Sequence, residues 1–301
     1  MSHPPIPPGA SRSAAARHAV VAGLVDTLVT LAALLAARSS VILADFFKTA
    51  LELVAVLLAW LVIRRIQRGA DDRFQYGVGK LENLASLFVG AIMIASLVII
   101  LGNALHNIRH PSHIAGAGVW ISLAAQLAYL IINGALCGKA RRLCAQNPSP
   151  IMASQMRLFA SKAFANLFIL ASLALSLVFH AHSWAMYIDP VAAMGVALFI
   201  LLAATGIFSN SFYDLLDRAL DEELQIVILR ELARHFDAYE AFHGVRSRRS
   251  GSHVFIEIFL EFHADKTMGE VQPVIDRLRR DIESQIPNSR VTVGLTTEPV
   301  R

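Results

Sequence analysis

The sequence has little of what soluble enzymes and nucleic-acid-binding proteins are built from. Only 17% of its 301 residues are charged, against about a quarter in ordinary soluble chains. Its two cysteines, Cys137 and Cys144, lack the spacing of a metal site, and we interpret them as reduced packing residues. No phosphate-binding loop, nucleophile–base set or haem motif is present, which argues against an enzyme. The net charge of +4 arises from basic residues in short loops beside apolar runs, so we expect no nucleic-acid partner.

Long apolar segments are what the chain has in quantity. Hydrophobic residues make up 55% of it, and a bilayer core about 30 Å thick is crossed by roughly 20 helical residues. We divide the chain into a disordered N-terminal tail (1–17), a six-span transmembrane domain (18–210) and a cytoplasmic C-terminal domain (211–301). The predicted transmembrane helices lie at about 19–37, 41–63, 84–105, 114–138, 153–181 and 187–208.

Basic residues are distributed unequally among the loops. They precede the first span and gather between the second and third spans and between the fourth and fifth, whereas the other loops hold few. Because basic residues favour the cytoplasmic side, we expect both termini to be cytoplasmic. The pattern predicts a multi-pass protein of a lipid bilayer and suits a bacterial inner (plasma) membrane.

The C-terminal part reads as a small α/β domain. Residues 222–236 have helical periodicity, and residues 251–263 alternate in the manner of a strand, with residues 245–251 as its partner across a tight turn. A helix over 268–286 and a strand over 289–295 follow. The order α-β-β-α-β predicts helices packed on a sheet.

Five ionisable residues fall inside the predicted spans, where such groups are functional-site candidates. The first span holds Asp26 and the fifth Lys162, while Asp45, Lys48 and Glu52 share one face of the second. We expect these three spans to meet around a polar interior, with the third, fourth and sixth wrapping around it or dimerising. Two simpler interpretations stay open: Lys48 and Glu52 pair within one helix, and Lys162 extends to the membrane surface.

Several segments, in order, resemble the cation diffusion facilitator family. They are "SSVILAD" (39–45), "YGVGKLENLASL" (76–87), "DP" (189–190), "LLDRALDEE" (215–223) and "RSRRSG" (246–251). The resemblance implies a six-helix bundle with a metallochaperone-like cytoplasmic domain, export of divalent metal in exchange for protons, and a homodimer. It also implies a charge pair, Lys80 with Asp217, that joins the two parts.

The metal positions that the resemblance implies are mostly altered. In the second span Lys48 and Glu52 occupy them, and in the fifth span Leu158 and Lys162 do, with Asn166 at a family asparagine one turn on. Zinc and iron prefer imidazole, carboxylate or thiolate ligands. With Asp45 the set contains two acids and two lysines, so we interpret Asp45, Lys48, Glu52 and Lys162 as a charge network in place of a metal site.

Most of the metal-ligand positions that the resemblance implies outside the spans are also altered. Asp71 keeps one in a loop and His243 keeps one in the cytoplasmic domain, so these two are weak metal candidates. Phe74, Val78, Phe259, Gln272 and Gly294 stand where other ligands are expected. We predict no resident cofactor.

Two functions from different classes follow. The first is a membrane cation transporter with an altered site, coupled to protons. Its substrate would be a monovalent or organic cation, or a divalent metal held by Asp26, Asp45 and Glu52 when Lys48 swings away. The second is a transport-incompetent member that acts as a scaffold or regulatory dimer partner, because ligands are lost while Lys80 and Asp217 are kept.

Overall fold

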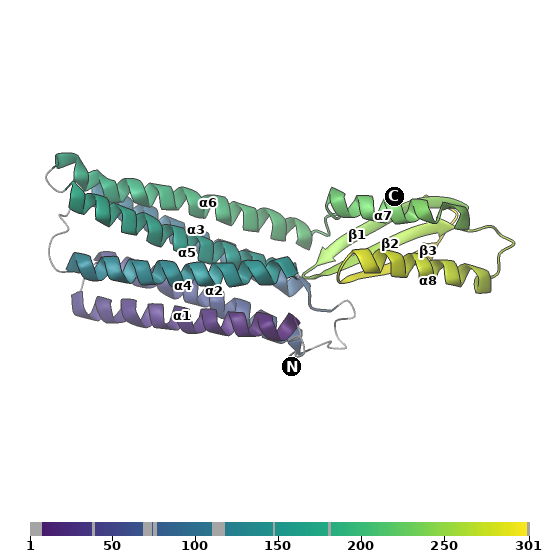
Figure 1. Ribbon diagram of the computed structural model, residues 1–301, viewed down its shortest axis with the longest axis horizontal. Coiled ribbons are helices and arrows are strands. Elements are labelled where there is room, and N and C mark those ends of the chain that lie inside the picture. The colour runs from purple at the N-terminus through teal and green to yellow at the C-terminus, as the bar shows by residue number, and fades with distance from the viewer. Residues whose placement is uncertain are drawn as a thin grey trace, which may run out of the picture. The chain divides into compact units, whose positions relative to one another are not determined.

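The computed structural model describes residues 8–37, 40–68, 74, 77–109, 118–146, 148–179 and 182–299. The chain divides into two compact units, Met1–Ser211 and Phe212–Arg301, here named the membrane unit and the C-terminal unit (Figure 1). Asp71 lies outside the described residues, as does the side chain of Asp45.

Six long helices form the membrane unit. Each has 28 to 30 residues, which at 1.5 Å per residue is about 42–45 Å, longer than the hydrocarbon core. All six are apolar enough to cross a membrane, which confirms the six predicted spans. They are α1 (Pro8–Ala37), α2 (Ser40–Gln67), α3 (Lys80–Arg109), α4 (Gly118–Gln146), α5 (Pro150–Val178) and α6 (Ile188–Leu215), with a short 3-10 helix, η1 (Ser183–Tyr187), before the last.

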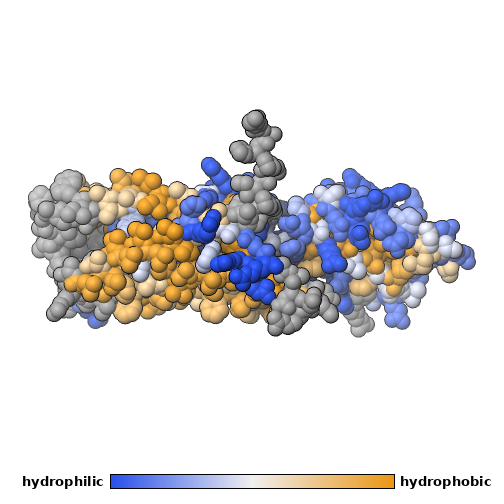
Figure 2. Space-filling view, turned by 90° about the horizontal axis from the view of Figure 1, so that it is seen from below, coloured by the Kyte–Doolittle hydropathy of each residue, from blue (hydrophilic) through white to orange (hydrophobic). Residues whose placement is uncertain are grey.

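The surface of the membrane unit is apolar. Figure 2 shows hydrophobic side chains over most of its visible face, whereas polar side chains dominate the C-terminal unit. Exposed large hydrophobic residues occur on all six helices, for example Val25, Val98 and Leu202. Lipid tails would cover such a surface, as expected for a multi-pass membrane protein.

Glycine lets α6 approach its neighbours closely. A Cβ at Gly195 would lie 2.7 Å from Phe168 Cε1 on α5, and one at Gly90 of α3 would lie 3.0 Å from Phe208 Cε2 on α6. Helices in lipid associate mainly through close packing, so small residues at such crossings stabilise the bundle.

The C-terminal unit is a three-stranded sheet with two helices on one face. Its elements are α7 (Glu222–Arg234), the short η2 (Phe236–Ala238), β1 (Ala241–Ser250), β2 (His253–Glu261), α8 (Met268–Gln285) and β3 (Ser289–Leu295). The strands lie in the order β1-β2-β3; β1 is antiparallel and β3 parallel to β2. This confirms the predicted α-β-β-α-β order.

The alternation of β2 decides which face of the sheet the helices cover. Val254, Ile256, Ile258 and Leu260 point to one face and form a core with residues of α7 and α8. The strand β1 begins at Ala241, four residues earlier than predicted, and pairs along its length with β2 apart from an irregularity between Phe242 and Gly244. The turn between the strands uses Gly251 at φ 61°, a conformation that glycine adopts at little cost.

Candidate functional site

Three ionisable side chains from three helices meet inside the membrane unit. The ammonium of Lys162 on α5 donates a hydrogen bond to Asp26 Oδ2 on α1 at 3.1 Å. The same nitrogen lies 2.9 Å from Glu52 Oε2 on α2, an ion pair. The side chains of Asp26 and Lys162 are 15% exposed and that of Glu52 is 7% exposed. We name these residues the central triad.

The triad shows how the charges in the spans are arranged. The first, second and fifth spans meet at this point, as expected from their ionisable residues. The expected network contained Asp45 as its second acid, whereas the structure places Asp26 of α1 beside Lys162. Lys48, one helical turn before Glu52, lines the cavity that borders the triad. Asp26 and Glu52 therefore face two ammonium groups, and among the described side chains these four charges sum to zero. Lys162 points into the bundle, where both carboxylates bind its ammonium.

The triad lies between two cavities. One, of about 160 Å³, is bordered by Thr30 of α1 and Lys48 of α2; the other, of about 180 Å³, is bordered by Ala19 and Val56 of the same helices. Because α1 and α2 are joined by a short connection and run in opposite directions (Figure 1), these positions lie on opposite sides of the triad along the bundle axis. All three triad residues line both cavities.

Helix α4 contributes to this interior, which corrects the expectation that it only wraps around it or dimerises. Tyr129 and Asn133 line both cavities, and Gln126 lines one. Their spacing of three and four residues places them on one face of the helix. The sequence-based prediction considered only charged residues in the spans and therefore missed these uncharged polar residues. Their spacing of three and four residues can be read from the sequence.

Two polar atoms in the smaller cavity have no hydrogen-bond partner in the part of the chain that the structure describes. Gln126 Oε1 and Asn166 Nδ2 are buried and have no hydrogen-bond partner among the described residues. Buried polar groups are nearly always paired, so such atoms indicate water or a ligand in the cavity. Asn166, the position that the resemblance aligns with a family asparagine, lines this cavity together with Lys162.

The fourth position that the resemblance assigns to a ligand is apolar. Leu158 is 2% exposed and belongs to the hydrophobic core of the bundle. The described side chains around the triad thus offer two carboxylates, and one ammonium binds both. A dication would have to displace or deprotonate that ammonium, because like charges 4 Å apart repel by about 4 kcal/mol at an effective dielectric of 20.

A second polar cluster lies at one end of the bundle, around Glu82 of the segment 76–87. Glu82, near the start of α3, is 3% exposed. It accepts a hydrogen bond from Ser149 Oγ, before α5, at 2.5 Å, and Arg12 of α1 lies 3.9 Å away. These contacts tie three parts of the bundle together, which indicates a structural role for this segment.

The remaining predicted site residues are dispersed. His243 Nε2 lies 2.7 Å from Glu261 Oε2 in the C-terminal unit. Asp217 lies 3.5 Å from Arg248 in the same unit, and its pairing with Lys80 stays a prediction. Phe74 is half exposed, and Asp71 is not among the described residues.

Comparison with known proteins matches both units. Residues 17–216 match the model of the cation efflux transmembrane domain, and residues 220–295 match that of the cytoplasmic domain of cation efflux proteins.

Similar proteins include cation-efflux pumps FieF. The one from Klebsiella pneumoniae strain 342 is 29% identical over 286 residues, covering 94% of this chain and 91% of the relative. Those from Pectobacterium atrosepticum (27% over 256 residues) and Escherichia coli O9:H4 strain HS (28% over 255 residues) each cover 84% of this chain and 81% of the relative. The resemblance noted in the sequence is confirmed: the chain belongs to the cation efflux, or cation diffusion facilitator, family of membrane transporters.

Proposed function

We propose that this chain exchanges a cation for a proton at the central triad, with the ammonium of Lys162 occupying the position of the transported ion. The observation that carries the proposal is the placement of one ammonium between two buried carboxylates, Asp26 and Glu52, with a cavity on each side. A transport site needs access from both sides of the membrane and a group that changes charge. The cavities on either side of the triad and its ionisable side chains support the assignment of this role to the triad.

Charge balance at the triad determines which cation is exchanged for a proton. When a cation enters between Asp26 and Glu52, Lys162 releases one proton and becomes a neutral amine, so a monovalent cation leaves the net charge of the site unchanged. A divalent ion adds one further charge, which Lys48 would have to compensate by moving away or losing its own proton. The site therefore favours a monovalent cation over a divalent metal. The unpartnered Gln126 Oε1 offers the entering ion a further oxygen ligand.

The same ion pairs also support a second function. A triad whose charges are already satisfied is stable without any ion, as a scaffold or regulatory dimer partner would require. The two functions differ in whether the Lys162 proton exchanges. The triad separates two cavities, which a purely structural ion pair would not need, so we place transport first.

Measurement of proton flux in proteoliposomes distinguishes transport from a scaffold function. Vesicles containing a pH-sensitive dye and the purified protein would receive sodium, potassium, zinc, manganese or iron(II) gradients. We expect proton movement with a monovalent cation, lost in Glu52→Gln and in Lys162→Gln. Lys139→Gln, an exposed lysine near the end of α4, is the matched control and should retain flux. No flux with any cation would refute transport and leave the scaffold; flux with zinc alone would refute the monovalent preference.

We further propose that the protein works as a homodimer in a bacterial inner membrane, with both termini cytoplasmic. Support comes from the distribution of basic loop residues and from the match to the cytoplasmic domain of cation efflux proteins. Chemical cross-linking in native membranes would show a doubled mass. Protease accessibility of the C-terminal unit from the cytoplasmic side of inverted vesicles would show the orientation, and protection there would contradict it.

A further inference from the structure

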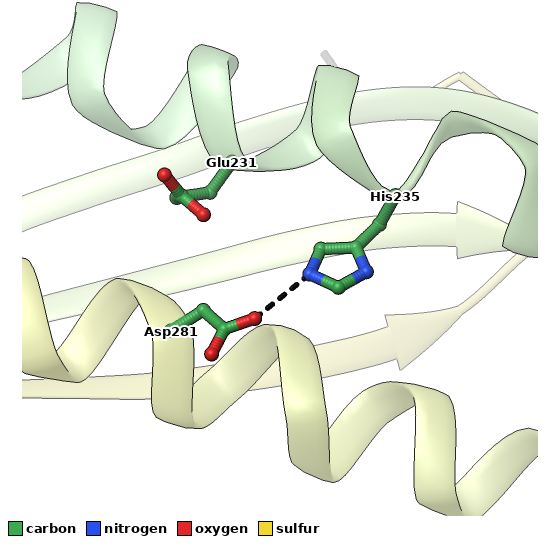
Figure 3. A group of neighbouring side chains, drawn as sticks. All are labelled: Glu231, His235 and Asp281. Carbon is green, nitrogen blue, oxygen red and sulfur yellow. Dashed lines mark hydrogen bonds and ion pairs between the residues drawn. The ribbon is translucent and has the colours of Figure 1, made fainter.

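Three side chains with metal-binding atoms converge between α7 and α8 of the C-terminal unit (Figure 3). They are Glu231 and His235, four residues apart at the end of α7, and Asp281 of α8. His235 Nε2 lies 2.9 Å from Asp281 Oδ2, and one donor atom from each residue lies within 4.8 Å of the other two. Neither the altered transport positions nor His243 belongs to this group.

The three residues differ in exposure, so the group has one buried ligand and one that faces solvent. The side chain of Glu231 is 2% exposed, that of His235 is 16% exposed, and that of Asp281 is 43% exposed. An ion would enter past Asp281 and meet Glu231 at the bottom. Zinc sites with three protein ligands take a water molecule as the fourth, and solvent would reach the ion on the side of the exposed Asp281.

The buried carboxylate is held in place by its neighbours. Arg234 Nη1 and Gln285 Nε2 both donate to the same oxygen of Glu231, Oε1, at 2.7 and 2.5 Å. Such outer contacts orient metal ligands in known sites. Arg234 supplies one positive charge against the two carboxylates, so with a neutral imidazole the group carries a net charge of −1 and attracts a cation.

The donor set indicates the kind of ion. One imidazole nitrogen and two carboxylate oxygens suit zinc or a similar first-row dication, with bonds of about 2.0–2.2 Å. A tetrahedral arrangement with these bonds separates the donors by about 3.3 Å. The His235–Asp281 separation is 2.9 Å and all three donor atoms lie within 4.8 Å of one another. Rotation of the two more exposed side chains, His235 and Asp281, toward Glu231 would bring the three donors to this spacing.

We propose that Glu231, His235 and Asp281 form a binding site for one divalent transition-metal ion, which links α7 to α8. Other histidines of this unit make simpler pairs: His263 with Glu240 at 3.2 Å, and His243 with Glu261. Among the described residues, the α7–α8 group is where three such donors meet. The site is independent of the transport proposal, since it lies wholly within the C-terminal unit.

Cobalt(II) titration of the full-length protein in detergent tests this site, because cobalt replaces zinc and its visible absorption reports tetrahedral coordination. We expect wild-type protein to bind one more cobalt ion per chain than His235→Gln, with a tetrahedral spectrum that zinc abolishes. Asp281→Asn should bind this ion with an affinity lower by roughly tenfold or more. His263→Gln, which removes the histidine of a two-residue pair, is the matched control and should titrate like wild type.

Far-UV circular dichroism would verify that each variant is folded. Asp281 is on the surface, so Asp281→Asn carries the test even if His235→Gln fails to fold. Identical cobalt affinity and spectra for wild type and the Asp281 variant would overturn the proposal and leave a helix-bridging ion pair. Loss of the same spectrum in His263→Gln would also overturn it, because the ion would then be bound elsewhere.

Discussion

Replacing Lys162 with methionine should strongly destabilise the membrane unit. Methionine has a similar length and no charge, so it leaves Asp26 and Glu52 together without their shared counter-ion. The lysine nitrogen lies 3.1 Å from Asp26 Oδ2 and 2.9 Å from Glu52 Oε2. Removing it therefore exposes two buried carboxylates to each other.

The magnitude follows from these distances. At about 3 Å and an effective dielectric of 20, each pair is worth about 5 kcal/mol before the cost of burying the charges. That cost cancels much of the attraction, and removing one partner of a buried pair typically costs about 3–5 kcal/mol. We expect Lys162→Met to lower the free energy of unfolding by about 3–5 kcal/mol.

A double-mutant cycle separates the ion pair from general packing. Glu52→Gln alone leaves Lys162 paired with Asp26 and should cost less than Lys162→Met. Because Glu52→Gln also removes one of the two unpaired carboxylates, the double variant should be more stable than the sum of the single effects predicts, by about 1–3 kcal/mol. Reversible unfolding in mixed detergent micelles, followed by circular dichroism, would measure all four proteins.

Lys139→Met provides the control, because Lys139 is exposed near the end of α4. It should change the free energy of unfolding by less than about 0.5 kcal/mol. If Lys162→Met is equally mild, or if the effects of Lys162→Met and Glu52→Gln simply add, the central triad does not stabilise the bundle and the reasoning is wrong.

Two further predictions concern packing and pH. Gly195→Ala should lower the melting temperature, because the new Cβ would lie 2.7 Å from Phe168 and overpacking costs about 1–3 kcal/mol. Gly138 has open space around it, so Gly138→Ala should leave the melting temperature unchanged. Equal effects of the two substitutions would contradict close packing of α5 and α6. In the C-terminal unit, hydrogen bonds from the backbone and side chain of Thr267 hold the pKa of Glu270 below its ordinary value of 4.5. A carboxyl with a lowered pKa in the folded state stabilises the protein fully above its unfolded-state pKa, and this stability is lost as the pH falls through the folded-state pKa. When the free energy of unfolding is measured as the pH is lowered, Glu270→Gln should therefore lose less stability than wild type. Identical pH dependence in the two proteins would contradict this.

Much of the architecture was predictable because it depends on local patterns. A helix in lipid must satisfy its own backbone hydrogen bonds and expose apolar side chains, so each span is recognisable from its own residues. The strand β2 is equally local, since Val254, Ile256, Ile258 and Leu260 alternate with less apolar neighbours and all four prove buried. Ionisable residues in spans stand out for the same reason, and Asp26, Glu52 and Lys162 were identified individually.

Which of these residues meet was decided by packing. Charged residues in the first, second and fifth spans predicted that these spans meet, but Asp26 and Lys162 are 136 residues apart, and no periodicity within either helix shows that these two side chains would pair. The sequence pointed to Asp45 as the second acid because it shares a face with Glu52, a relation within one helix.

The same limit explains the polar stripe of α4 and the group of Glu231, His235 and Asp281. The sequence alone determined the number of spans, the order of the C-terminal elements and the presence of charge in the bilayer, since each follows from neighbours along one helix or strand. Only the tertiary structure decided which charges neutralise each other and where metal-binding atoms converge, because electrostatic attraction and coordination depend on distances between helices.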